Sequence, residues 1–104
     1  MKTCFIYTTF PNRAEAKSLI TKLIESGLIA CANIFPETTA IYQWENKIQE
    51  QNEVAAYLKT MEDKFTAAKE FIENNHPYEC PCVAKIFIDE INENYFKWLK
   101  ESLS

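Results

Sequence analysis

The segment HPYECPC, residues 76–82, concentrates the soft-ligand chemistry that this sequence offers. It holds the single histidine, His76, and two of the four cysteines, Cys80 and Cys82. Two thiolates suit a soft ion such as Cu(I). Tetrahedral zinc needs four ligands, and His76 and Cys31 are the available additions. The sequence therefore allows a metal site formed by His76, Cys80, Cys82 and Cys31.

A structural interpretation of the same cysteines competes with the metal interpretation. Pro81 favours an extended path at Cys80, and we expect a strand over residues 80–88 in which Cys80 and Cys82 share a face. Their Cα atoms would lie roughly 6.6 Å apart at ~3.3 Å per residue, near the upper limit for a disulfide. Cys80 can equally serve as a small buried hydrophobic residue. For Cys31 and Cys4, packing is the expected role.

A second group of candidates consists of aromatic and charged side chains. Tyr42 and Trp44 are two positions apart in a strand-like segment, so they share a face. They line either a ligand cleft or a subunit interface, and the enrichment of aromatic residues at interfaces favours the interface. Lys59, near the end of another strand, either pairs with Glu79, meets an anionic ligand or lies in solvent. Tyr78 and Glu79, in the HPYECPC segment, are further candidates for the cleft or interface.

Catalysis is not expected from this sequence. A Cys–His pair can provide a nucleophile, but the sequence identifies neither a third, orienting group nor an oxyanion hole. Glycine-rich phosphate loops and the common hydrolase motifs are also missing, and the chain has one glycine. We therefore predict a protein that is not an enzyme.

Length and composition limit the remaining possibilities. The 104 residues form a single domain, residues 1–104, with a net charge of −4 (11 basic against 15 acidic residues). The chain has no basic block, which argues against nucleic acid as a partner. The start of the sequence does not resemble a secretory signal, and the apolar run 28–35 is too short to cross a bilayer. We expect a cytoplasmic protein, independent of membranes, whose cysteines stay reduced.

The periodicity of apolar residues predicts four to five strands and three helices. The first helix is expected to start after Asn12, with Glu15 completing an N-x-x-E pattern, and to end at Gly27. The long strand is expected to hold a bulge or a solvent-facing end at residues 49–53, next to a turn at Asn46-Lys47. We expect strands at 2–9, 28–35, 38–45, 47–60 and 80–88, and helices at 13–26, at 62–74 and from Asn92 onward.

The order of these elements is typical of an α+β protein with the ferredoxin-like β-α-β-β-α-β plan and an additional C-terminal helix. In this plan the helices cover one face of an antiparallel sheet. The fold supports many activities, so it does not by itself identify a function.

Six segments of the sequence together resemble the CutA family of divalent-cation tolerance proteins. They read YTTFPNRAEA, LIACANIF, IYQWENKI, LKT, HPYECP and NYFKWL, in the family's order and across nearly the whole chain. The resemblance implies a homotrimer of ferredoxin-like subunits without catalytic turnover. It also implies a link to copper and other divalent cations.

This chain departs from the usual family pattern in two places. Asn46 stands where the family has a glycine in a turn, a small change for the backbone. Cys80 and Cys82 stand where the family usually has an apolar and an acidic residue, which adds two thiols. We therefore expect a soft metal ion, copper or another divalent cation, to be bound or buffered.

The alternative is a signalling module similar in architecture to the PII family. In this interpretation a small anion or nucleotide binds in the clefts between subunits. The residues that would line such a cleft are Tyr42, Trp44, Lys59, His76 and Tyr78.

Overall fold

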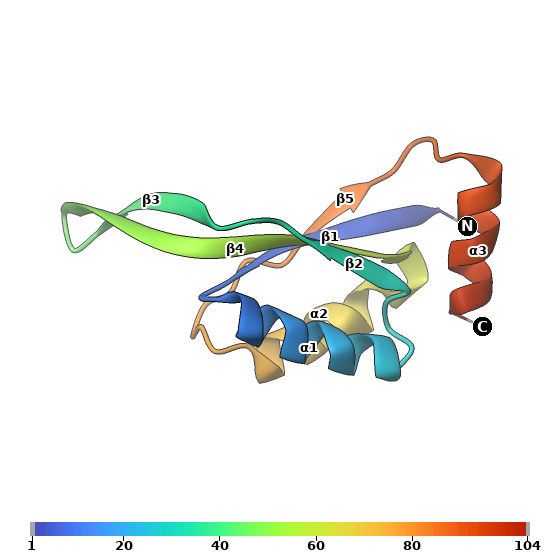
Figure 1. Cartoon of the computed structure of the whole chain (residues 1–104), viewed down its shortest axis with the longest axis horizontal. Coiled ribbons are helices and arrows are strands. Elements are labelled where there is room, and N and C mark those ends of the chain that lie inside the picture. Colours follow the sequence, from blue (N-terminus) through green and yellow to red (C-terminus); the bar gives the residue numbers. More distant parts are fainter. Residues whose placement is uncertain (1, 104) are drawn as a thin grey trace.

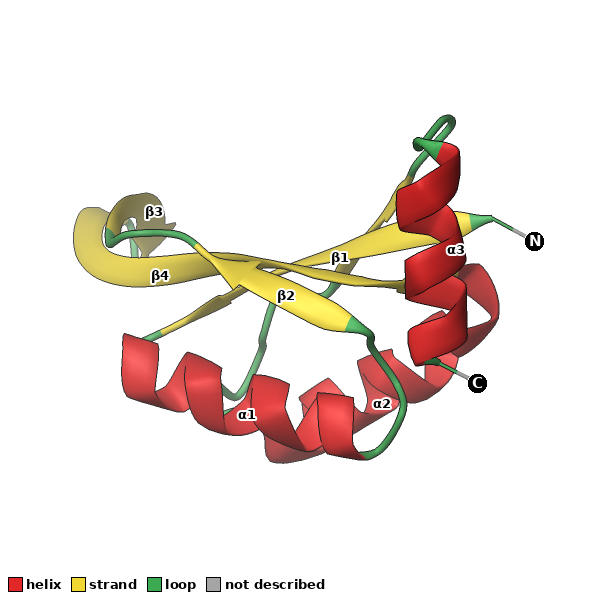
Figure 2. Ribbon diagram, turned by 45° about the vertical axis from the view of Figure 1, so that its right-hand side comes forward, coloured by secondary structure: helices red, strands yellow, loops and turns green. Residues whose placement is uncertain are grey.

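The alternating apolar pattern of the strands produces an antiparallel sheet with two helices on one face (Figures 1 and 2). A computed structural model describes residues 2–103. The strands are β1 (Thr3–Phe10), β2 (Cys31–Ile34), β3 (Thr38–Trp44), β4 (Lys47–Met61) and β5 (Ala84–Phe87), and the helices are α1 (Arg13–Glu25), α2 (Phe65–Asn75) and α3 (Glu93–Ser102), with a short 3₁₀ turn, η1 (Glu62–Lys64), before α2. The chain is thus an α+β protein with three α-helices in the described residues.

Strand β4 organises the sheet. The strand order is β2-β4-β1-β5. Strand β4 has 15 residues, and β3 pairs with its N-terminal part, residues 47–53. All pairs are antiparallel. Strands β3 and β4 form a hairpin that projects beyond the body of the molecule, and its turn residues Glu45 and Asn46 both have positive φ. The expected turn is therefore present, one residue earlier than Asn46-Lys47.

The core lies between the sheet and helices α1 and α2. Alternate residues of β1, among them Ile6 and Phe10, are fully buried, whereas Phe5 and Tyr7 between them are half-buried. Leu58 of β4 and Leu23 of α1 are also fully buried in this layer. The period-2 alternation thus separates the face covered by α1 and α2 from the opposite face, on which Phe5, Tyr7 and Tyr57 are neighbours.

Both ends of α1 follow from side-chain chemistry. The Asn12 side-chain oxygen accepts a hydrogen bond from the Glu15 backbone N–H at 2.8 Å, which caps the first turn. Gly27 has φ +72°, and its N–H donates to Ile24 O while Leu28 N–H donates to Leu23 O. These two bonds form a Schellman motif, which stops the helix and turns the chain toward β2. The predicted start and end of this helix are confirmed.

Strands β2 and β3 are two segments of one path beside β4, separated by an irregular stretch. Ile34 pairs with Ala56, but Thr38 pairs with Glu53, so residues 35–37 lie opposite only residues 54–55. The extra residue is a β-bulge, and it contains Pro36, which has no N–H for the ladder. The ladder across residues 47–53 is regular, so the bulge expected at 49–53 lies instead on the partner path, and only the solvent-facing end is confirmed.

The strand predicted over residues 80–88 is much shorter, because β5 covers only Ala84–Phe87. Residues 77–80 form bends, and Cys80-Pro81-Cys82 lies outside any strand. Pro77 and Pro81 cannot donate to a ladder, which explains the late start of β5. The expectation that Cys80 and Cys82 share a face was based on this strand and loses its support.

The projecting hairpin makes the subunit elongated. Its principal extents are 46 × 25 × 23 Å, and the radius of gyration is 14.5 Å. A compact chain of this length has a radius of gyration of about 13 Å. Helix α3 lies at the opposite end of the sheet from the hairpin (Figure 1).

Candidate functional site

A groove of about 550 Å³ lies where the base of the hairpin meets the loop that precedes β5. The aromatic rings of Tyr42, Trp44 and Tyr78 line it, together with Ala40, Gln51, Glu53 and Cys80. Tyr42 and Trp44 are indeed on one face of β3, and residues 49 and 51 of β4 share that face through the ladder. The hairpin supplies two of the rings, and the loop after α2 supplies the third.

A directed chain of hydrogen bonds holds the groove together. Tyr42 Oη donates to Gln51 Oε1 at 3.0 Å, and Gln51 Nε2 donates to Tyr78 Oη at 3.3 Å. Tyr78 Oη in turn donates to Glu53 Oε2 at 2.7 Å. Burial, together with this bond to the carboxylate, raises the pKa of Tyr78 well above its usual range. Tyr78 therefore stays protonated and acts as the donor that fixes Glu53.

His76 lies beside this groove with both ring nitrogens engaged. Its Nε2 is 2.8 Å from Thr9 O, and its Nδ1 accepts a hydrogen bond from Tyr78 N–H at 3.0 Å. Because Thr9 O only accepts, Nε2 carries the proton and the ring is held in one neutral tautomer. The ring also stacks on Phe10, with centroids 5.0 Å apart. A metal ion at His76 would have to replace one of these two hydrogen bonds.

Cys80 and Cys82 are both exposed free thiols, and Cys80 lines the groove. Cys4 is fully buried, and burial raises its pKa to about 11, so it is neither accessible nor readily ionised. Within residues 2–103, no three His, Cys, Asp or Glu side chains gather closely enough to hold a metal ion. One subunit thus offers at most the pair Cys80 and Cys82 in this region.

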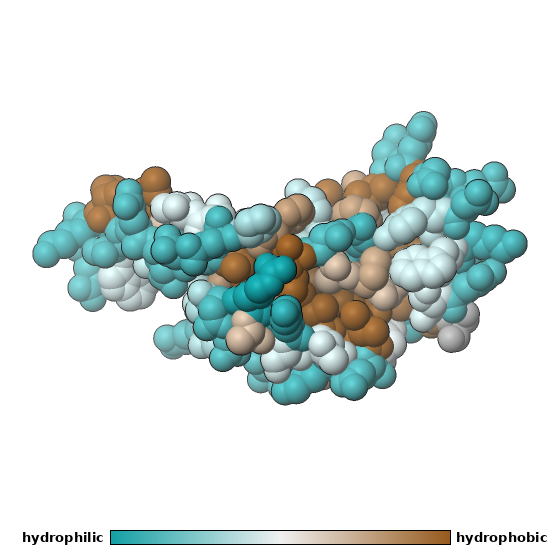
Figure 3. All heavy atoms as spheres, viewed as in Figure 1, coloured by the Kyte–Doolittle hydropathy of each residue, from teal (hydrophilic) through white to brown (hydrophobic). Residues whose placement is uncertain are grey.

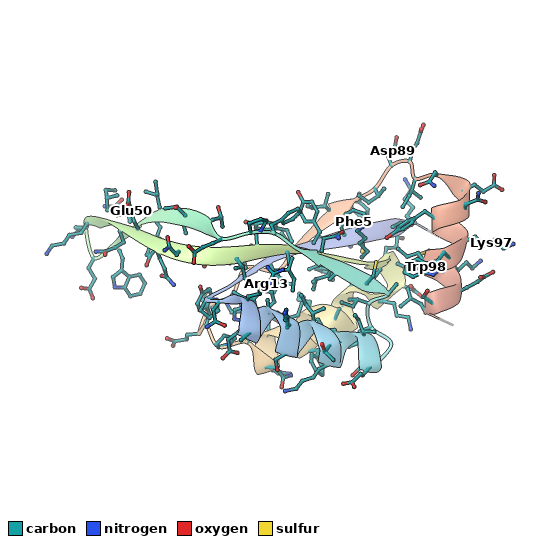
Figure 4. The ribbon with its side chains drawn as sticks, viewed as in Figure 1. Phe5, Arg13, Glu50, Asp89, Lys97 and Trp98 are labelled. Atoms are coloured by element: carbon teal, nitrogen blue, oxygen red, sulfur yellow. The ribbon has the colours of Figure 1, made fainter. Side chains whose placement is uncertain are left out.

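A second polar cluster lies at the opposite end of β4, under α3. Tyr95 Oη is 3.3 Å from Cys31 Sγ and accepts a hydrogen bond from Lys59 Nζ at 3.2 Å. The Lys59 ammonium also lies over the rings of Phe5 and Tyr95, 5.4 and 5.2 Å from their centroids. The hydrogen bond with Cys31, followed by burial, raises the pKa of Tyr95, while the Lys59 charge acts in the opposite direction. Figure 4 shows Phe5 on the sheet and Trp98 on the adjacent helix α3.

The structure therefore separates residues that the sequence grouped together. Glu53 and Lys59 are six positions apart on β4, about 20 Å at ~3.3 Å per residue. Lys59 and Cys31 belong to the α3 end, whereas Tyr42, Trp44, Tyr78 and Cys80 belong to the groove. Lys59 contacts Tyr95 rather than Glu79, which follows Tyr78 in the distant loop. The proposed ligands Cys31 and Cys80 do not meet within the subunit.

Three residues of these sites were not expected from the sequence: Gln51, Glu53 and Tyr95. The alternation of Gln49, Gln51 and Glu53 along β4 matches the face of Tyr42, and this period-2 signal could have placed them in the groove. Tyr95 was assigned only to the apolar face of the last helix. No signal in the sequence pairs it with Lys59, 36 residues earlier.

The family described as "CutA1 divalent ion tolerance protein" matches residues 4–102 of this chain. The chain belongs to the CutA1 family. The divalent-cation tolerance protein CutA of Pyrococcus horikoshii is 47% identical over 96 residues, covering 92% of this chain and 93% of that protein. The resemblance found in the sequence motifs is therefore confirmed.

Solved CutA1 structures share the fold of this CutA1-family chain. The CutA1 of Ehrlichia chaffeensis has a TM-score of 0.96 at 35% identity and covers 100% of this chain and 98% of its own. A structure described as the periplasmic divalent cation tolerance protein CutA of Archaeoglobus fulgidus has a TM-score of 0.94 at 32% identity, covering 98% of this chain and 99% of its own. The family is named for tolerance of divalent cations and not for an enzymatic reaction, which supports a role of this chain in metal tolerance.

No helix within residues 2–103 combines the length and the apolar character that a membrane crossing requires.

Proposed function

We propose that this chain contributes to divalent-cation tolerance as a non-catalytic, cytoplasmic homotrimer that binds or buffers a soft metal ion, with copper as the first candidate. The observation that carries the proposal is the pair of exposed thiols, Cys80 and Cys82, one residue apart in a CutA1-family protein. Thiolates favour soft or borderline metals such as Cu(I) and zinc, and Cu(I) is the first candidate because two thiolates suffice for a low-coordinate site.

Cys80 and Cys82 form the core of the proposed site because the other soft groups have structural partners. His76 uses both ring nitrogens in hydrogen bonds to the backbone of Thr9 and Tyr78. Cys31 lies with Tyr95 at the far end of the sheet. His76 and Cys31 remain the candidates for additional ligands, His76 after losing a hydrogen bond and Cys31 through a neighbouring subunit.

The shape of the chain supports the proposed assembly of ferredoxin-like subunits into a trimer. An isolated two-stranded hairpin is at best marginally stable in water. The hairpin of β3 and β4 nevertheless projects from the body and carries Ile41 and Ile48, on the face away from the groove, with 65% and 72% of their surface exposed. Figure 3 shows hydrophobic atoms gathered on this projection. Exposed apolar surface of this kind is typical of an interface between subunits.

Native mass spectrometry of freshly reduced protein, titrated anaerobically with Cu(I), tests the proposal. We expect a trimer that takes up copper at a fixed stoichiometry, about one ion per thiol pair. The variant Cys80→Ser/Cys82→Ser should lose this uptake, while the matched control Cys4→Ala, which removes a buried thiol outside the proposed site, should keep it. His76→Gln shows whether the imidazole joins the site.

Copper uptake that is equal in the wild-type protein and in Cys80→Ser/Cys82→Ser would contradict the proposed ligands. A trimer that takes up no Cu(I) would contradict metal buffering and leave the assembly unaffected.

The alternative function is a signalling module that binds a small anion or nucleotide between subunits, and one observation favours it. The half-buried Lys59 ammonium has a hydroxyl and two aromatic rings as its recorded partners, none of which balances its charge. An anion from solution, or an anionic group of a bound ligand, would balance the charge of Lys59. In this alternative Lys59 and Tyr95 carry the function, and the groove residues do not.

A thermal-shift screen with nucleotides and small carboxylates tests the alternative, because a ligand that binds the native state raises the melting temperature. Lys59→Met should remove the shift, whereas Cys80→Ser should preserve it. A shift that persists in Lys59→Met would argue against this site.

A further inference from the structure

We propose that the groove between the β3–β4 hairpin and the loop before β5 binds a small organic cation of the substituted-ammonium class. This inference goes beyond metal tolerance and does not depend on metal binding. It is based on three properties of the groove: its aromatic lining, its single carboxylate and the form of its hydrogen-bond chain.

The lining of the groove is aromatic and carries one negative charge. Tyr42, Trp44 and Tyr78 supply three π faces, and Glu53 supplies the only charged side chain among the seven lining residues. Aromatic faces attract cations through the ring quadrupole, and quaternary ammonium groups are commonly recognised in this way. None of the seven lining residues is a lysine or an arginine, so no basic side chain of the lining balances the charge of Glu53.

The volume of the groove suits a small molecule. Binding sites for small ligands usually measure about 300–1,000 Å³, and this groove has about 550 Å³. Trp44 is 63% exposed, so much of its surface remains free for a ligand.

The hydrogen bonds of the groove determine which kind of cation fits. Glu53 Oε2 already accepts the Tyr78 hydroxyl proton at 2.7 Å, so only the second carboxylate oxygen is free of this bond. A guanidinium binds a carboxylate best through two parallel hydrogen bonds, which this occupied oxygen disfavours. A metal ion needs several lone pairs, which aromatic faces do not offer. A bulky substituted ammonium needs only a nearby negative charge and apolar or aromatic walls.

The three protons of the Tyr42–Gln51–Tyr78–Glu53 chain all point toward the carboxylate. This order fixes the Glu53 side chain in one position. The Tyr78 ring lies against His76, whereas the rings of Tyr42 and Trp44 are exposed. The site is therefore preorganised, which lowers the entropic cost of binding.

Fluorescence titration of the assembled protein with choline tests this proposal. The chain has two tryptophans, and Trp98→Phe leaves Trp44 as the only reporter, inside the groove. We expect choline to change the Trp44 emission along a saturable curve. Its neutral isostere, 3,3-dimethyl-1-butanol, has the same shape without the charge and should give no saturable change over the same concentrations.

Four variants in the Trp98→Phe background sharpen the test. Glu53→Gln removes the charge at nearly constant size and should weaken choline binding at least about tenfold, as expected for the loss of a charged partner. Tyr42→Leu removes a ring and should weaken choline binding most. Tyr42→Phe keeps the ring and loses only the hydroxyl that donates to Gln51, so it should bind choline more tightly than Tyr42→Leu does. Cys82→Ser, at an exposed thiol outside the groove lining, should bind choline normally, which separates this site from the thiol pair proposed for the metal.

The proposal is overturned if the assembled protein does not bind choline, or if the neutral isostere binds equally well. It is also overturned if Glu53→Gln, shown to be folded by its far-UV circular dichroism and assembly mass, binds choline like the parent protein. If Glu53→Gln does not fold, Tyr42→Leu and Tyr42→Phe provide the test instead. Equal affinities of these two variants for choline would then overturn the proposal.

Discussion

The four cysteines of this chain illustrate how position, rather than residue type, determines chemistry. Cys4 is fully buried behind the sheet, Cys31 shares a hydrogen bond with Tyr95, and Cys80 and Cys82 face solvent. Burial disfavours the thiolate, and a protonated thiol neither binds metal nor reacts readily. Only the two exposed cysteines therefore have the access that a soft-metal ligand requires.

The buried thiol of Cys4 makes stability depend on pH in the alkaline range. Its pKa is raised from the ordinary 9.0 to about 11, mainly by burial. Between these values the unfolded chain releases the proton while the native protein keeps it, so the free energy of unfolding falls as pH rises from about 9 to about 11. We expect a smaller fall in Cys4→Ala, measured by chemical denaturation at several pH values.

Lysines and tyrosines titrate in the same range. The informative quantity is therefore the difference between wild type and Cys4→Ala in how steeply the free energy of unfolding falls with pH. Cys4→Ala should be less stable at pH 7, because it leaves a small cavity. If the free energy of unfolding falls equally steeply in the two proteins between pH 9 and 11, the pH dependence does not come from Cys4.

At the residue scale, the sequence identified most members of the groove but not their grouping. Tyr42 and Trp44 were correctly placed on one face because strand alternation is local. The partnership of Tyr78 with Glu53 joins positions 25 residues apart, and that of Lys59 with Tyr95 joins positions 36 residues apart. Such contacts depend on how the elements pack, which no local periodicity encodes.

The secondary-structure elements were predictable wherever their ends carry chemical signals. Asn12 and Gly27 fix both ends of α1, and the structure confirms them. The start of β5 was predicted four residues too early, because a run of β-favouring residues outweighed two prolines in the prediction. The proline at 81 in fact keeps Cys80 and Cys82 outside the ladder.

Gly27 offers a test of the helix end that does not involve the core. A Cβ at this position would have no neighbour within 4 Å, so the cost of Gly27→Ala comes from φ +72° alone. We expect a loss of about 1 kcal/mol of stability, typical for an L-residue in the left-handed region. Equilibrium denaturation at neutral pH measures this loss.

Gly27→Asn is the matched variant, because asparagine tolerates positive φ better than alanine does. It should lose less stability than Gly27→Ala. A Gly27→Ala protein as stable as wild type would show that the helix end relaxes to another conformation.

At the scale of the whole molecule, the hairpin dominates the expected behaviour. Ile41 and Ile48 lie diagonally across the β3–β4 ladder on one face, and both are largely exposed in the subunit. Tyr42 and Trp44 occupy the other face. In a monomer, both faces of this extended hairpin would expose apolar residues to water. This exposure supports burial of at least one face between subunits.

The double variant Ile41→Glu/Ile48→Glu should weaken the proposed trimer while each subunit stays folded. Buried charges without partners oppose association, and we expect dissociation at a protein concentration at least about tenfold higher. The dissociation constant of a trimer scales with the square of concentration, so this shift is equivalent to ~2.8 kcal/mol per trimer. Analytical ultracentrifugation over a dilution series measures this change. Ile24→Lys, on the exposed side of α1, is the matched control and should assemble normally. An unchanged assembly in the double variant would exclude this face of the hairpin from the interface.

The bulge at residues 35–37 has a consequence for how proteins with this fold diverge. Because a bulge bends and twists its strand, the extra residue sets the direction in which the hairpin leaves the body of the subunit. The core lies elsewhere, between the sheet and α1 and α2. The deletion of one residue here would therefore change the direction of the β3–β4 hairpin and leave the core of the domain intact. Changes in the symmetry or affinity of the assembly could thus arise in evolution through insertions and deletions at this point, without any substitution at the contact surface.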